Sequence, residues 1–137
     1  MTNESPKGVV LYPDRMKAYE RGGGAKTIPL VGPSIGARSF LNGMTIFGPG
    51  AAIPLHTHNC EESVLLLEGR AIAEIDGERH EIEAGDLSWI PEGVPHRFIN
   101  ASGTEGMKIL WTYARVDATR TLVETGETRP VLAEHKD

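Results

Sequence analysis

Short segments rich in Val, Ile, Leu and aromatic residues recur along the chain, and Gly and Pro separate them. This pattern is typical of many short strands joined by tight turns, as in a sandwich or barrel. No segment has apolar residues at the regular three- to four-residue spacing of an amphipathic helix. The pattern predicts nine strands, at 27–31, 38–47, 53–58, 63–67, 70–75, 78–82, 87–90, 96–100 and 108–114.

A hairpin is predicted where the segments 70–75 and 78–82 flank Asp76-Gly77. An Asp-Gly pair suits a two-residue turn because both of its positions need a positive φ. The segment 63–67 is apolar without alternation, which predicts a strand that is covered on both faces.

The length of 137 residues favours a single domain. We expect an irregular N-terminal arm over 1–24, a barrel over 25–115 and a C-terminal tail over 116–137. The arm ends in three consecutive glycines and has an alternative, a strand at 9–12. The tail has no clear period and is expected to extend over the barrel or onto a second subunit.

Composition narrows the function classes. The 14 basic and 19 acidic side chains form no basic patch, so nucleic acid is not an expected partner. No apolar run approaches the roughly 20 residues of a membrane span, and the N-terminus lacks the pattern of a secretory signal. A single cysteine excludes an intrachain disulfide. We therefore expect a cytoplasmic protein without a membrane partner.

Three histidines and a glutamate form a candidate metal site. His56 and His58 are two residues apart, so on a strand both imidazoles face the same side. Glu62 follows after a turn, and His96 can complete the site from a distant strand. Three nitrogens and one carboxylate suit a borderline divalent ion. A buried histidine is also an ordinary core residue, so the pair alone leaves both interpretations open.

Two stretches match sequence motifs. In the first, Gly50 is followed by five residues, by His56-Thr57-His58, by three residues, by Glu62, and after six more residues by Gly69. In the second, Gly85 is followed by five residues and then by Pro91-Glu92-Gly93, His96 and Asn100 at fixed offsets. In both stretches the chain resembles the cupin superfamily, of the compact microbial kind.

The resemblance implies an all-β, double-stranded β-helix, the jelly-roll or RmlC-like barrel. It also implies that His56, His58, Glu62 and His96 hold one divalent metal ion, for which Mn, Fe, Ni, Co and Zn all qualify. The motif spacing selects Glu62 over its neighbour Glu61, and alternation puts the two carboxylates on opposite faces. We assign Asn100 a structural role, holding the nearby loop through backbone hydrogen bonds.

Four further residues are pocket candidates. Arg38 would pair with an anionic substrate if its strand faces the interior. Cys60 lies in the turn between the strands that carry the ligands. Three roles are open for it: a fifth metal ligand, a reactive thiol, or a small side chain that fills space. Phe98 should wall the pocket because it is two residues from His96. Trp111 lies near the end of the barrel. Three positions are open for its side chain: lining the pocket, packing in the core, or forming a dimer contact.

These observations support two functions. The first is a metal-dependent enzyme that uses the ion as Lewis acid and template on a small oxygen-rich molecule, as an isomerase, lyase or dioxygenase. The alternative is a cupin that binds or senses a small molecule or metal without catalysis. The open edge strands of such a barrel favour a homodimer.

Overall fold

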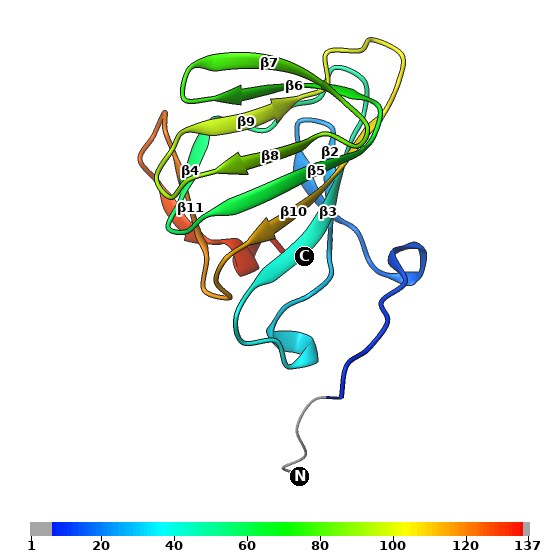
Figure 1. Cartoon of the computed structure of the whole chain (residues 1–137), viewed down its shortest axis with the longest axis vertical. Coiled ribbons are helices and arrows are strands. Elements are labelled where there is room, and N and C mark those ends of the chain that lie inside the picture. The colour runs from blue at the N-terminus through cyan, green and yellow to red at the C-terminus, as the bar shows by residue number, and fades with distance from the viewer. Residues whose placement is uncertain (1–6, 136–137) are drawn as a thin grey trace.

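The computed structural model describes residues 7–135, and its strands form two antiparallel six-stranded sheets (Figure 1). The first sheet contains, in spatial order, β1 (Tyr19–Gly22), β2 (Ala25–Pro29), β3 (Leu41–Phe47), β10 (Met107–Tyr113), β5 (Glu62–Glu68) and β8 (Leu87–Ile90). The second contains β12 (Thr128–Pro130), β11 (Thr119–Leu122), β4 (His56–His58), β9 (His96–Ile99), β6 (Arg70–Ile75) and β7 (Glu78–Glu83). Three short 3₁₀ helices complete the fold: η1 (Pro13–Arg15), η2 (Pro33–Ile35) and η3 (Val131–His135).

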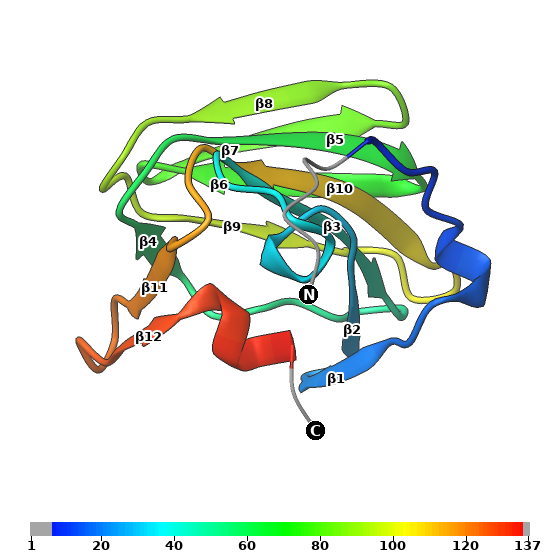
Figure 2. The same ribbon diagram turned by 90° about the horizontal axis from the view of Figure 1, so that it is seen from below.

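The core lies between the two sheets, which face each other in the view of Figure 2. Strand β10 shows how the sequence builds it, because buried and half-buried residues alternate along its whole length. Alternate side chains of a strand point to opposite faces, so Met107, Ile109, Trp111 and Tyr113 all enter the interior. The predicted all-β jelly roll is confirmed.

All nine predicted strands are present. The Asp76-Gly77 turn is confirmed as well, with φ of 50° and 81° between β6 and β7. The strand expected at 38–47 begins only at Leu41, because η2 precedes it and ends on Gly36 in the left-handed region. Positive φ there turns the chain before it can extend.

The N-terminal segment differs from the expected irregular arm. Residues 9–12 lie outside any strand, whereas β1 pairs with β2 around Gly22, Gly23 and Gly24. All three glycines have positive φ, so the run that was expected to end an arm is the turn of a hairpin.

The C-terminal segment also adds strands. β11 pairs with β4, with Arg120 opposite His58, and β12 pairs with β11. These strands are only four and three residues long, too short for an alternation to stand out in the sequence. The edge of β4 supplies the backbone hydrogen bonds that β11 needs. Pairing with a neighbouring strand, and not the intrinsic propensity of the residues, therefore makes this segment a strand. Within residues 7–135, no helix has the length and apolar character needed to cross a membrane.

Candidate metal centre

Two adjacent strands bring the three motif histidines together. His56 and His58 are both buried on β4, with half-buried Thr57 between them. β9 pairs antiparallel with β4 and places His96 directly opposite His56. The ring centroids lie 4.8 Å apart for His56 and His58, and 4.4 Å for His56 and His96. One ligand atom from each histidine lies within 4.8 Å of the others, a spacing compatible with a shared metal ion.

Backbone carbonyls fix which nitrogen of each ring faces the centre. Nδ1 of His56 lies 2.7 Å from the Pro54 carbonyl oxygen. Nδ1 of His58 and of His96 each lie 2.8 Å from a carbonyl oxygen, of Thr119 and Val94 respectively. A carbonyl only accepts hydrogen bonds, so each Nδ1 carries a hydrogen, and in the neutral ring Nε2 is the nitrogen with the lone pair. Metal-binding histidines are commonly oriented in this way, by a hydrogen bond from the ring nitrogen that does not bind the metal.

Glu62 begins β5 and faces the same interior, with a side chain only 5% exposed. Its Oε1 lies 2.8 Å from Nε2 of His96 and 3.5 Å from Nε2 of His58. A carboxylate oxygen and a nitrogen lone pair repel each other unless a proton or a cation lies between them. Moreover, Nε2 of His58 is buried and makes no hydrogen bond to any residue in the range 7–135. The donors fit a metal ion.

Burial keeps His56 and His58 neutral. It lowers the pKa of His58 to about 4, although Glu62 acts in the opposite direction. It also lowers the pKa of His56 well below the usual value, and the charge of Arg120 lowers it further. Two of the three imidazoles are therefore unprotonated at neutral pH, as metal binding requires. Burial raises the pKa of the neighbouring Tyr113 phenol well above its usual value, so this phenol stays protonated.

The adjacent carboxylates of Glu61 and Glu62 lie in different environments. Glu61 is exposed and accepts a hydrogen bond of 2.9 Å from Nε1 of Trp89, whereas Glu62 is buried beside the histidines. The alternation argued from the sequence therefore describes this pair correctly.

A small cavity of about 10 Å³ adjoins the histidines, room for about one water molecule. Its lining residues are Arg21, Thr45, Ile53, His56, Glu62, His96, Phe98, Ile109, Trp111, Tyr113 and Arg120. A recess of about 510 Å³ lies next to it and shares Arg21, Ile53 and Arg120 with it.

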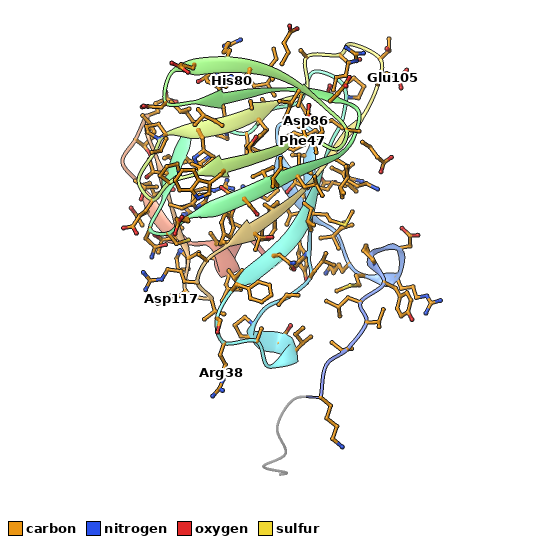
Figure 3. The ribbon with its side chains drawn as sticks, viewed as in Figure 1. Arg38, Phe47, His80, Asp86, Glu105 and Asp117 are labelled. Carbon is orange, nitrogen blue, oxygen red and sulfur yellow. The ribbon has the colours of Figure 1, made fainter. Side chains whose placement is uncertain are left out.

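Only two of the four pocket candidates lie at the cavity. Phe98 and Trp111 line the cavity. Cys60 is buried in the turn before β5 but does not line it, and burial raises the pKa of its thiol. The interior position considered for Arg38 is wrong, because this residue precedes β3 and points outward at the lower end of the barrel (Figure 3).

Sequence reasoning missed the arginines that do line the cavity, Arg21 and Arg120. They lie in the segments that were interpreted as an arm and a tail. The one available signal was the pattern Thr119-Arg120-Thr121, in which β-branched residues flank a long side chain on the opposite face.

A jelly roll with inward-facing histidines on adjacent strands defines a class of metal-binding barrels. Comparison of the chain with known protein families agrees with this class. The cupin domain family matches residues 43–113, about half of the chain. The chain belongs to this family.

Several known proteins are similar to the chain. Dimethylsulfoniopropionate lyase DddW from Ruegeria pomeroyi is 36% identical over 83 residues, which are 61% of this chain and 53% of that protein. Quercetin 2,3-dioxygenase from Bacillus subtilis is 42% identical over 52 residues, 37% of this chain and 15% of that protein. The chain thus spans about half of the first relative and a small part of the second.

Among solved structures, the polyketide cyclase RemF from Streptomyces resistomycificus superposes with a TM-score of 0.73 at 23% identity, covering 91% of this chain and 86% of that one. At this identity the likeness supports the fold alone.

Proposed function

We propose that this protein is a metal-dependent enzyme that acts on a small oxygen-rich molecule. One divalent ion would be held by His56, His58, His96 and Glu62. The observation that carries the proposal is the convergence of three buried histidines beside a buried carboxylate. Mn, Fe, Ni, Co and Zn all accept such a donor set.

When bound, the ion supplies Lewis acidity that stabilises negative charge on a substrate oxygen. The protein's own residues orient and enclose the substrate. The three carbonyl-bound Nδ1 atoms hold the imidazoles in place. Phe98 and Trp111 wall the cavity and exclude water. The protonated phenol of Tyr113 lines the same cavity and can donate a hydrogen bond to a negatively charged oxygen.

The relatives support two reaction types. The similarity to a lyase covers 61% of this chain, and that to a dioxygenase covers 37%. We therefore favour lyase- or isomerase-type chemistry, with dioxygenation as the alternative when the ion is Fe(II).

The metal site is tested by elemental analysis of purified protein and of single variants. H56A, H58A, H96A and E62Q should each lose most of the bound metal. E61Q is the matched control, because it removes the adjacent exposed carboxylate, and it should keep its metal. Unchanged metal content in the histidine variants, or equal loss in E61Q and E62Q, would refute the ligand assignment.

Catalysis is tested by screening metal-loaded protein against keto acids, sugar acids and catechols, with dioxygen consumption recorded in parallel. Turnover that a folded H96A variant lacks supports the enzyme, and dioxygen uptake identifies an oxygenase. Tight binding of a compound without turnover across the panel would instead favour the binding or sensing function.

A further inference from the structure

The carboxylate of Glu134 lies between two buried arginines at the mouth of the barrel. Its Oε2 is 2.7 Å from Nη2 of Arg21 and 3.0 Å from Nη1 of Arg120. The two arginine side chains are only 9% and 8% exposed, and that of Glu134 is 17% exposed. Because isolated charges are costly to bury, this arginine pair requires an anion beside it.

The arginine pair marks the boundary between the outside and the candidate metal centre. Both arginines line the 510 Å³ recess as well as the small cavity with the histidines. Arg120 is opposite His58 across the β4–β11 pair, so its side chain shares the interior face. The cavity has room for about one water molecule, so a substrate that reaches the histidines from the recess must pass or displace the Glu134 contact.

Arg21 is held in position by a chain of hydrogen bonds. Its Nη1 donates to Oγ1 of Thr27 at 3.2 Å, and that oxygen lies 3.1 Å from Oγ1 of Thr45. Nε1 of Trp111 donates to the same Thr45 oxygen at 2.8 Å. The guanidinium is therefore oriented before any ligand arrives, which lowers the ordering cost of binding.

The arginine pair has binding capacity that Glu134 does not use. The shortest contact of Glu134 with each guanidinium is made by the same oxygen, Oε2. Nε of Arg120 is buried without an acceptor among the described residues. Burial and the nearby charge of Arg120 lower the pKa of Arg21, whereas the charge of Glu134 acts in the opposite direction. Guanidinium groups favour bidentate binding of carboxylates, for which a free ligand offers two oxygens.

The segment that carries Glu134 is short, and its backbone is anchored at its beginning. Glu134 belongs to the five-residue 3₁₀ helix η3, which lies beside β12 and β1 (Figure 2). Val131 anchors this turn, since it is buried and its N–H donates to the Ala118 carbonyl at 2.9 Å. A short turn of this kind can move without disturbing either sheet.

We propose that Arg21 and Arg120 form the recognition site for the carboxylate of a small organic acid, and that Glu134 occupies this site until the acid displaces it. The occupant is itself a carboxylate, which favours this ligand class over other anions. The step from recognition to reaction rests on the proposed function, because the acid would then reach the candidate metal centre.

The test uses metal-free, full-length protein and the probe malonate, with affinity measured by titration calorimetry. E134Q removes the competing negative charge from the site and should bind malonate about tenfold more tightly than the unchanged protein, since one charge-assisted contact becomes available. E127Q is the matched control, because it removes an exposed carboxylate at the rim of the recess that pairs with Arg129 at 3.1 Å. It should leave the affinity unchanged, and R120Q combined with E134Q should abolish the gain.

A second measurement does not depend on the stability of any variant. In the unchanged protein, titration with malonate should shift the Nε–H resonance of Arg120 in a nitrogen-proton NMR spectrum. A gain below threefold in folded E134Q, an equal gain in E127Q, an unmoved Arg120 resonance, or tighter binding of sulfate than of malonate would overturn the proposal.

The outcome is separable from that of the proposed function. If the histidine variants keep their metal while E134Q gains malonate affinity, the carboxylate site stands and the metal assignment fails. If the metal assignment holds and the gain is absent, only the carboxylate site fails.

Discussion

Replacing Asn100 by alanine should destabilise the barrel strongly without touching the candidate metal centre. Asn100 is 1% exposed and follows β9 directly. Its Nδ2 donates to the carbonyls of Glu105 at 2.8 Å and Gly48 at 3.0 Å. Its Oδ1 accepts from the Ser102 N–H at 3.1 Å. One side chain thus holds the loop after β9 to the end of β3, the structural role expected from the sequence.

The magnitude follows from the count of lost bonds. Each bond contributes about 1 kcal/mol net, and the partners left behind are only partly reached by water, so we expect a loss of about 3 kcal/mol. For a chain of this length, that corresponds to a fall in Tm of about 10 °C. The same loss should appear as a lower urea midpoint with an unchanged m-value.

Asn42→Ala is the matched control. Asn42 is half-buried, and its Oδ1 accepts one hydrogen bond of 2.8 Å from the Val31 N–H. It should cost about 1 kcal/mol. Metal content per folded molecule should be unchanged in both variants. A loss for N100A no greater than that for N42A would refute the reasoning from hydrogen bonds.

Three further predictions concern stability and assembly. In metal-free protein, His58 has a pKa of about 4 when folded and 6.5 when unfolded. The unfolded chain therefore binds a proton that the folded chain does not, so stability should fall by roughly 3 kcal/mol as pH drops from 6.5 to 4. Urea unfolding at several pH values checks this, and H58Q should lack that part of the slope. A Cβ at Gly43 would lie 2.5 Å from Cζ2 of Trp111, so G43A should cost about 2 kcal/mol. Gly103→Ala, which meets open space, should be neutral in the same thermal melts. The homodimer stays a prediction, and light scattering should give twice the chain mass of 14.9 kDa; a single-chain mass would contradict it.

The sequence could predict features that depend on neighbouring residues. The Asp76-Gly77 turn is one example, because its conformation depends on which residues tolerate positive φ. The shared face of His56 and His58 is another, since alternation along a strand needs no knowledge of the partner strand. The separation of Glu62 from Glu61 has the same origin.

The short strands near the two ends of the chain could not be predicted from their residues. β1, β11 and β12 are three or four residues long, and their own propensities do not distinguish them from loops. The strand β11 exists because β4 offers it an open edge, and that edge arises only when the barrel closes. The error at Arg38 has a related cause, since the start of β3 is decided by the turn at Gly36.

The class of fold and most of the strands could be inferred from the sequence alone, because alternation and turn residues are local properties. The convergence of His56, His58, Glu62 and His96 was implied by the resemblance of two motifs to the cupin superfamily. What surrounds these four residues depends on contacts between distant segments. Arg21 and Glu134 are separated by 112 intervening positions (22–133) yet share an ion pair of 2.7 Å. Such a contact depends on how β1, β11 and η3 close the barrel mouth together, and no local pattern of residues encodes that closure.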